Sequence, residues 1–550
     1  MRQKNGSEWL GTRAFINGVI HTLDQKNSIF QAMLVEDGVI RRLGTTEEIT
    51  TLGGQSVDLE GRTVIPGFND SHLHLLSYGM AVNSLDLREC QTKEAVLEKA
   101  REKVVQERPD RLWMAGFVNP YLFTRQELDK VSTHIPVFYT RVNGHTYAPT
   151  ATVLTKLCCN TRALELAGIC RNSQIPGVLM DEDGPTGILK GKSADLVRSL
   201  LPPLTRAQKK EALATATALL ASRGFTSVHS NDMEQGDLEL LEIFRELEQE
   251  GRLPLRVNMQ CLFDRVEDFE AFMEKDPRPS FNTRRHRLGA LKLILDGTLG
   301  ERTAALHKPY CDAPGNCGTL LFTREELEDL VKIAHRLEMQ VVMHAIGDRA
   351  IDQAIEVFES IQDKLGRKDL RHGIVHCLIT GPNAFSRMGR CGVTALIQPV
   401  AVASDYTALD SRLGPERMEG IYGWKSMLEH GIMVSGGTDC PCEEPDPFEG
   451  LACTITRQNG LGEPAGGFLP GERLTLEQAL RIMTVNGAYL SQEEEIKGSL
   501  EPGKLGDFIV LDQDIFMADP QNIRLTHCLA TVSGGKIVYA SSNNIAMAAD

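Results

Sequence analysis

Apolar residues follow two alternating patterns through the middle of the chain, from about residue 64 to residue 490. Short apolar runs of strand length alternate with longer stretches in which apolar residues recur at three-and-four spacing, as they do on one face of a helix. Eight strands are predicted: TVIPGF (63–68), FTSVHS (225–230), LRVNMQC (255–261), ALKLIL (290–295), MQVVMH (339–344), HGIVH (372–376), VTALIQP (393–399) and GIMVSGG (431–437).

The predicted helices lie between these strands. They include KKEALATATALLASRG (209–224), REELEDLVKIAHRLE (324–338) and DRAIDQAIEVFESIQDKLG (348–366), two of which have a glycine near the stop. Strands that alternate with amphipathic helices are typical of parallel βα units. Eight such units predict an α/β fold, a (β/α)₈ or TIM barrel over residues 64–490.

Both chain ends have a different, strand-and-turn texture. Asn17-Gly18, Asp37-Gly38 and Gly534-Gly535 lie between alternating apolar runs, as hairpin turns do. Because chain ends often lie close together in a domain, residues 1–63 and 491–550 are predicted to form one small sheet domain.

One further strand-like run, IPVFYTRV (135–142), lies in an irregular segment that is rich in Pro and Gly, from about residue 108 to residue 200. The other strands after the first are spaced at about the length of one βα unit. We therefore assign this run to a lobe inserted after the first barrel strand, and expect the lobe to form a lid over the barrel mouth.

Composition narrows the possible partners and compartments. The formal charge is 59 − 74 = −15, without a long basic run, which disfavours nucleic acid and anionic membranes as partners. We find no signal-peptide core and no apolar stretch of membrane-spanning length, so a cytoplasmic protein is expected. The 13 scattered cysteines suit reduced thiols better than a disulfide framework.

Candidate metal ligands end several of the predicted strands, where working residues lie in such barrels. His72 and His74 are one residue apart, so in an extended segment both imidazoles face one side and can bind one ion. The strand ends supply these candidates: His72, His74, Lys292 with Asp296, His344, His376 and Asp439. Each alone has a structural alternative, such as a core histidine or a helix N-cap, but together they predict a divalent metal site.

Lys292 leaves two alternatives open, because an ammonium group beside dications is unfavourable. Either it points away from the site, or it has reacted with carbon dioxide to form a carbamate that bridges two metals. A metal-held water would have its pKa lowered from 15.7 towards about 7 and provide hydroxide. Asp439 could then accept its proton and pass it to a leaving nitrogen, which describes hydrolysis of an amide-like bond.

Several motifs carry a family resemblance. PGFNDSHLH, LKLILDGTLGERTAAL, MHAIGDRAID, GIVH, SGGTDCP and LTLEQALRIMTVNGA followed by GSLEPGKLGDFIVLD resemble the amidohydrolase superfamily, specifically the amidohydrolase family 3 group that includes N-substituted formamide deformylases. The resemblance covers nearly the whole chain. It implies a distorted TIM barrel, a small β-sandwich from both termini and one or two metal ions, usually zinc. It also implies hydrolysis of carbon–nitrogen bonds other than peptide bonds.

By the same resemblance, His72 and His74 match the first-strand ligands and Lys292 the position that is carboxylated in many relatives. His344 and His376 match the next ligands, and Asp439 matches the catalytic aspartate.

The inserted lobe departs from the family pattern. Extra residues, TYAPTATVLTKLCC, separate Gly144-His145 from the stretch Asn160 to Leu164. His145, and His229 at the end of the second predicted strand, are candidates to bind substrate, with strand-capping or structural roles as the alternative. Arg302, Tyr310 and Arg457 are further residues near motifs that could contact substrate or form surface ion pairs.

A metal-dependent amidohydrolase acting on a small N-acyl or N-formyl compound is the leading hypothesis. The alternatives are a catalytically silent barrel that serves as a scaffold, or deamination, ester or lactone hydrolysis or isomerisation at the same metal site. Retention of all six positions that match the family ligands, His72, His74, Lys292, His344, His376 and Asp439, favours an enzyme, and Lys292 disfavours a one-metal deaminase. A homodimer is possible, although no interface stripe stands out.

Overall fold

The computed structural model describes residues 11–542 apart from 86, 88–89, 91, 117–120, 142–155 and 201–202. The chain falls into two compact units. The barrel unit comprises Met1–Leu73, Thr217–Thr438 and Pro445–Asp550, and the lobe unit comprises His74–Ala216 and Asp439–Glu444.

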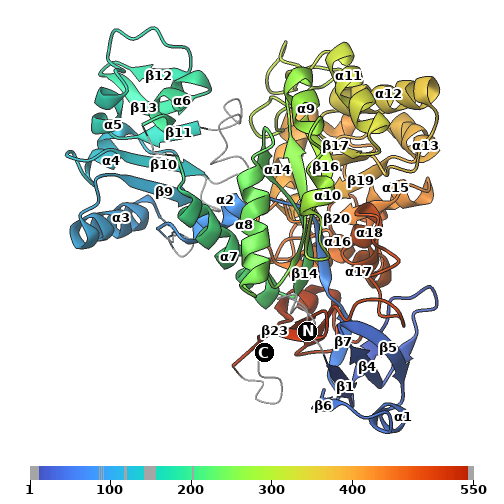
Figure 1. Ribbon diagram of the computed structural model, residues 1–550. Coiled ribbons are helices and arrows are strands. Elements are labelled where there is room, and N and C mark those ends of the chain that lie inside the picture. Colours follow the sequence, from blue (N-terminus) through green and yellow to red (C-terminus); the bar gives the residue numbers. More distant parts are fainter. Residues whose placement is uncertain are drawn as a thin grey trace. The chain divides into compact units, whose positions relative to one another are not determined.

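An eight-stranded parallel sheet forms the centre of the barrel unit (Figure 1). Its strands, in hydrogen-bonding order, are β8 (Phe68–Leu73), β14 (Phe225–Glu234), β15 (Arg256–Leu262), β16 (His286–Ile294), β17 (Gln340–Ala345), β18 (Gly373–His376), β19 (Thr394–Ile397) and β20 (Val434–Gly436). Asp70 on β8 accepts hydrogen bonds from Thr438, which follows β20, so the two edge strands come together. The predicted TIM barrel is confirmed, in a nearly closed form.

The barrel strands are buried on both faces, as parallel strands covered by helices are expected to be. Every residue of β15 and β17 is buried. Side chains from neighbouring strands meet inside the barrel in a small apolar cluster, and Leu490 at the end of helix α18 (Val485–Leu490) joins it. The strand members of this cluster are Ala290, Val342, Val375 and Leu396.

Amphipathic helices accompany the strands, and the three quoted from the sequence are confirmed. They are α7 (Arg206–Ser222), α11 (Arg324–Arg336) and α12 (Asp348–Leu365). The others are α8 (Leu238–Gln249), α9 (Val266–Met273), α10 (Arg278–Phe281), α13 (Pro382–Cys391), α14 (Ala401–Leu413), α15 (Trp424–Glu429), α16 (Pro447–Thr456), α17 (Leu476–Ile482), α18 (Val485–Leu490) and the 3₁₀ turns Pro415–Arg417, Pro470–Glu472 and Pro520–Leu525. No helix in the described residues combines the length and apolar composition of a bilayer-spanning segment.

The first barrel strand differs from its prediction. The apolar run over Thr63–Pro66 is β7, which pairs with β2 and β21 in another sheet, and the barrel strand begins only at Phe68. Gly67 separates the two strands. A side chain at this position would collide with Thr226, since an added Cβ would lie 2.2 Å from its methyl carbon. The Pro66-Gly67 break therefore divides two strands rather than interrupting one.

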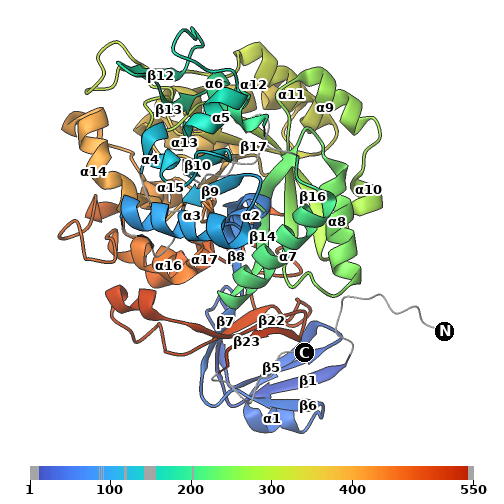
Figure 2. The ribbon, with the colours of Figure 1, turned by 90° about the vertical axis from the view of Figure 1, so that its left-hand side faces the viewer.

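Strands from both chain ends build two further sheets (Figure 2). One has the order β5 (Val39–Gly44), β4 (Ala32–Glu36), β1 (Thr12–Ile16), β6 (Gln55–Asp58), with helix α1 (Thr46–Thr50); the other has β23 (Lys536–Ala540), β22 (Cys528–Ser533), β21 (Phe508–Leu511), β7, β2 (Val19–His21), β3 (Ile29–Phe30). One apolar core joins residues of both ends, with Phe15 edge-on to Phe508 at 4.8 Å. The predicted sandwich from both termini is confirmed.

The three predicted turns of these sheets have different outcomes. Asp37-Gly38 joins β4 to β5 and Gly534-Gly535 joins β22 to β23, each in an antiparallel pair. Asn17-Gly18 links β1 to β2, which belong to different sheets, so the hairpin predicted there is wrong.

A five-stranded sheet forms the lobe unit, with the order β12 (Val178–Asp181), β13 (Gly184–Lys190), β11 (Lys156–Cys159), β10 (Val137–Arg141), β9 (Leu112–Gly116). Its helices are α2 (Leu75–Val82), α3 (Lys93–Glu107), α4 (Arg125–Asp129), α5 (Thr161–Leu166) and α6 (Lys192–Arg198). The run IPVFYTRV supplies β10, so its assignment to an inserted lobe is confirmed. The lid function of the lobe stays a prediction.

Candidate metal centre

Three of the predicted ligands meet inside the barrel unit. The ring of His376, at the end of β18, lies 4.5 Å from the ring of His344 on β17 and 5.7 Å from the ring of His72 on β8. His344 follows Val342 by two residues, so its side chain shares the face of β17 that lines the barrel interior. The three imidazoles therefore converge at the carboxyl ends of their strands.

His74 and Asp439 continue this group of donors. His74 precedes the first residue of α2, and its Nε2 lies 3.4 Å from Oδ1 of Asp439. The donor atoms of His72, His74 and Asp439 all lie within 4.8 Å of one another. Local chain geometry holds them there, because His72 and His74 are one residue apart and Asp439 follows Thr438, which is bound to Asp70.

This donor set fits a divalent metal ion. Zinc binds imidazole nitrogen and carboxylate oxygen at about 2.0–2.2 Å with tetrahedral geometry, so two donors of one ion lie about 3.5 Å apart. Donor atoms within 4.8 Å of one another therefore need to close by about 1 Å at most to bind one ion. Both histidines are 2% exposed, whereas the side chain of Asp439 is 18% exposed and can be reached by water.

Two residues of the centre have left-handed backbone conformations. The φ angles are 76° at His376 and 55° at Asp439. Such angles are uncommon for residues other than glycine, cost on the order of 1–3 kcal/mol, and cluster at functional sites. The left-handed conformation at His376 also changes the direction of its side chain. Val375 points into the barrel, so a regular strand would direct His376 outwards, and the left-handed residue turns the imidazole back towards the other ligands.

Gln398 fixes the orientation and protonation of His376. The amide nitrogen of Gln398 donates to the carbonyl of Leu396 at 3.3 Å, so its Oε1 is the atom that lies 2.7 Å from Nδ1 of His376. Since Oε1 can only accept, Nδ1 carries the proton, and Nε2 keeps the lone pair that a metal ligand needs.

Asp296 lies beside His344, in a contact that lacks hydrogen-bond geometry. Its Oδ1 lies 3.2 Å from Nδ1 of His344, and the carboxylate is fully buried. Backbone N–H groups of Ala305, Ile346 and Gly347 donate to this carboxylate at 2.8–3.0 Å. Asp296 thus links the loops after β16 and β17 to the imidazole between them.

Lys292 lies on β16 and is 1% exposed. It follows Ala290 by two residues, and Ala290 packs against Val342 inside the barrel. The Lys292 side chain therefore belongs to the interior face of the strand. The register pairs Lys292 with Val342, two residues before His344.

The two predicted substrate contacts have different outcomes. His145 lies outside the described residues. His229 lies in the middle of β14, which continues to Glu234, instead of at a strand end. Its Nδ1 is 3.3 Å from the amide nitrogen of Asn258. Burial, followed by the charge of Lys497, lowers the pKa of His229 to about 3, so this imidazole is neutral.

Other residues near the motifs have structural contacts. Arg302 pairs with Asp312 at 2.8 Å. Tyr310 donates from its hydroxyl to the carbonyl of Ala304, and Arg457 is fully buried with its guanidinium over the ring of Trp424. All 13 cysteines are free, and their reduced state stays a prediction.

Sequence reasoning missed Asp70 and Gln398. Asp70 precedes His72 by two residues in FNDSHLH, and Gln398 follows the interior residue Leu396 by two. The alternation of side chains along a strand therefore placed both residues on the face of the candidate site. A single polar residue near a strand end does not, however, show which residue it binds.

Known proteins resemble this chain along nearly its whole length. The model of the amidohydrolase family matches residues 55–539. The putative amidohydrolase YtcJ of Bacillus subtilis is 32% identical, covering 96% of this chain and 99% of that protein. The N-substituted formamide deformylase of Arthrobacter pascens is 26% identical, covering 95% and 97%.

Among solved structures, an uncharacterized metal-dependent hydrolase from Pyrococcus horikoshii has a TM-score of 0.76 at 28% identity, covering 92% of this chain and 99% of that one. Together with the family match, these findings confirm the resemblance drawn from the motifs. The chain belongs to the amidohydrolase family.

Proposed function

We propose that the protein hydrolyses a non-peptide carbon–nitrogen bond in a small N-acyl or N-formyl compound, with zinc as the metal. The observation that carries the proposal is the grouping of His72, His74 and Asp439 within 4.8 Å, with His344 and His376 beside His72. Nitrogen donors with one carboxylate are a ligand set that zinc prefers.

The bound metal would supply two effects, a lowered pKa for an attacking water and polarisation of the substrate carbonyl. The protein residues then have separate roles. His72, His74, His344 and His376 would hold the zinc ion or ions through one nitrogen each. Asp439, the more exposed residue of the group, would accept a proton from the attacking water at a carboxylate oxygen and deliver it to the leaving nitrogen.

Lys292 is assigned as a carbamate in this proposal. A buried ammonium next to a dication is unfavourable, whereas a carbamate is anionic and offers two oxygen atoms. Its place on the interior face of β16, beside the strand that carries His344, would allow such a carbamate to act as a ligand of a second metal ion. Carbamate formation is reversible, so the second ion and the modification are expected to depend on each other.

The choice of substrate class has one further support. The deformylase from Arthrobacter is similar along 95% of this chain, and its name states that it acts on N-substituted formamides. A formamide hydrolysed at its carbon–nitrogen bond releases formate and an amine. This reaction needs the proton transfer assigned to Asp439, because an unprotonated amine anion is a poor leaving group.

Release of amine from a panel of N-formyl and N-acyl compounds by the zinc-loaded protein tests the proposal. At least one compound should be hydrolysed, and Asp439→Asn should lower its kcat by about 10²–10⁴-fold while zinc is retained. Asp410→Asn, on the exposed side of α14, is the matched control and should be unaffected.

Three results would contradict it. Activity that survives removal of zinc or the Asp439→Asn substitution would exclude the assigned chemistry. Ammonia release from an aminated heterocycle, with no turnover of the amides, would indicate a deaminase. A protein that binds no metal and turns over nothing would indicate a scaffold.

A further inference from the structure

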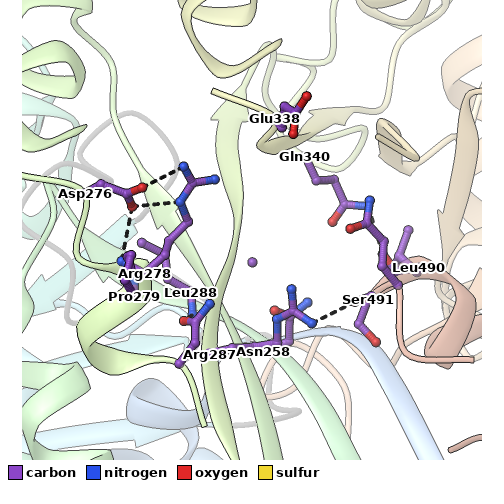
Figure 3. A pocket seen from close by; sticks show the side chains of 13 residues that line it. Asn258, Asp276, Arg278, Pro279, Arg287, Leu288, Glu338, Gln340, Leu490 and Ser491 are labelled. Atoms are coloured by element: carbon purple, nitrogen blue, oxygen red, sulfur yellow. Dashed lines mark hydrogen bonds and ion pairs between the residues drawn. The ribbon is translucent and has the colours of Figure 1, made fainter. Parts of the chain in front are cut away.

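A cavity of about 420 Å³ lies at the amino ends of strands β15, β16 and β17 (Figure 3). Volumes of roughly 300–1,000 Å³ are typical of small-molecule sites. The cavity is on the face of the barrel opposite to the metal centre. Gln340 lines it and lies four residues before His344 on β17, about 13 Å along the strand.

The cavity wall has an excess of positive charge at Arg287. The two carboxylates that line the cavity are already paired, Asp276 with Arg278 at 2.7 Å and Glu338 with Lys368 at 3.3 Å. The carboxylate near Arg287 is Glu493, at 3.9 Å.

Glu493 is shared with a second cation, because its other oxygen binds Lys497 at 2.7 Å. Burial alone would raise the pKa of Glu493, but Lys497 and Arg287 outweigh it and lower the pKa to about 2. One anion thus faces two cations. His229, whose pKa is about 3, adds no charge.

Arg287 also has unused hydrogen-bonding capacity. One terminal nitrogen donates to the carbonyl of Ser491 at 3.2 Å, and its buried Nε has no partner among the described residues. Its side chain is 30% exposed and can be reached from the cavity. A planar guanidinium with free N–H groups is suited to a carboxylate.

The amide side chains of Gln340 and Asn282, which also line the cavity, have hydrogen-bonding groups left over. The amide nitrogen of Gln340 donates to the carbonyls of Arg371 and Leu490, so its oxygen remains as an acceptor. The oxygen of Asn282 accepts from the N–H of Leu288, so its amide nitrogen remains as a donor. In Figure 3, Asp276 and Arg278 lie on one side of a central strand, and Gln340 and Leu490 lie on the other.

We propose that this cavity is a second ligand site, which takes a small aliphatic carboxylate with one neutral hydroxyl or amide group. The carboxylate binds Arg287, the neutral group binds the amides of Gln340 and Asn282, and the aliphatic part contacts Pro279, an exposed apolar residue of the lining. The proposal does not depend on the reaction assigned to the metal centre.

Calorimetric titration of the full-length protein with 4-hydroxybutyrate tests this site. Saturable binding is expected, and Arg287→Gln should weaken it at least about tenfold, because hydrogen bonds to a charged group are lost. Arg265→Gln, which removes an equal charge from an exposed position, should bind like the unaltered protein. Gln492→Glu, at an exposed position of the cavity rim, should also weaken binding, and it keeps the test valid if Arg287→Gln fails to fold.

Two comparisons separate this site from other anion sites. His344→Ala should bind 4-hydroxybutyrate unchanged, since the metal centre is not involved. Inorganic phosphate should bind more weakly, because it makes no apolar contact. The proposal would be overturned by absent or nonsaturable binding, or by affinities of Arg287→Gln and Gln492→Glu that equal the affinity of the unaltered protein. Loss of binding in His344→Ala, or tighter binding of phosphate than of 4-hydroxybutyrate, would also overturn it.

Discussion

The carboxylate of Asp70 binds Thr438 through three hydrogen bonds. The backbone N–H of Thr438 lies 3.1 Å from both carboxylate oxygens, and its hydroxyl donates to Oδ2 at 2.6 Å. Asp70 also accepts from the backbone N–H of His72 at 3.0 Å. His72 is itself one of these donors, and Asp439 is the residue after Thr438. Asp70 therefore connects the two chain segments that carry candidate metal ligands.

Replacing Asp70 by Asn should therefore weaken both the fold and the metal site. An amide NH₂ cannot accept from Thr438, so we expect the free energy of unfolding to fall by about 1–3 kcal/mol. Zinc affinity, measured by competition with a chelator, should fall about tenfold or more. Thr438→Val is the control, because it loses the hydroxyl contact and keeps the backbone contacts, and its effects should be smaller. Equal zinc affinity in Asp70→Asn would show that this contact does not position the ligands.

Gln398 offers a test of how His376 is held. Gln398→Leu removes the acceptor for Nδ1–H, so zinc affinity should fall about 10–100-fold. Gln398→Glu keeps an oxygen at this position and should retain most of the affinity. A loss of the same size in both variants would instead indicate a packing role for Gln398.

The assignment of Lys292 predicts a modification and a metal stoichiometry. Native mass spectrometry of the zinc-loaded protein should show two ions and a mass increase equal to one carbon dioxide. Lys292→Ala should lose both the mass increase and the second ion, and keep the first. An unmodified Lys292 with a single ion at full activity would favour a one-metal enzyme.

A buried ion pair links the barrel to the strands of the terminal sheets. Arg256, at the start of β15, binds Asp507 at 2.7 Å, and both side chains are at most 5% exposed. Removing one partner of such a pair leaves a buried charge, so Asp507→Ala should lower the free energy of unfolding by about 3–5 kcal/mol at pH 7. Asp512→Asn, in a more exposed pair with His527, should change it by less than about 1 kcal/mol.

The same pair predicts a pH dependence. Burial raises the pKa of Asp507, but Arg256 outweighs it, and the pKa lies below its usual value. Because this pKa is lower in the folded state, the charged carboxylate stabilises the folded protein above the unfolded-state pKa of about 3.9. This stabilisation is lost as the pH falls through the folded-state pKa. The stability difference between the unaltered protein and Asp507→Ala should therefore shrink below about pH 4 in urea titrations. A difference that is constant from pH 7 to pH 3 would contradict this origin.

The barrel was predictable because its signals are local and repeated. Strand and helix periods alternate many times, and the carboxyl ends of parallel strands lie on one face, so His72, His344 and His376 could be grouped from sequence alone. The division at Pro66-Gly67 was not predictable in the same way. Whether an apolar run on one side of a break joins one sheet or another depends on partners hundreds of residues away, here β21.

The contacts around the candidate ligands show the same limit. Gln398 is separated from His376 by 22 residues and Thr438 from Asp70 by 368, and no local pattern pairs them. His229 was misplaced because its strand is longer than its apolar run, so the predicted strand end was in fact the middle of β14.

Anomalous X-ray scattering at the zinc edge, from crystals of the zinc-loaded protein, tests the central claim most directly. We expect zinc peaks among the side chains of His72, His74, His344, His376 and Asp439, and the peak beside His72 and His74 should disappear in the double variant His72→Ala, His74→Ala. Crystals of a protein that is active with zinc, but shows no peak among these five side chains or shows its peak elsewhere, would contradict it.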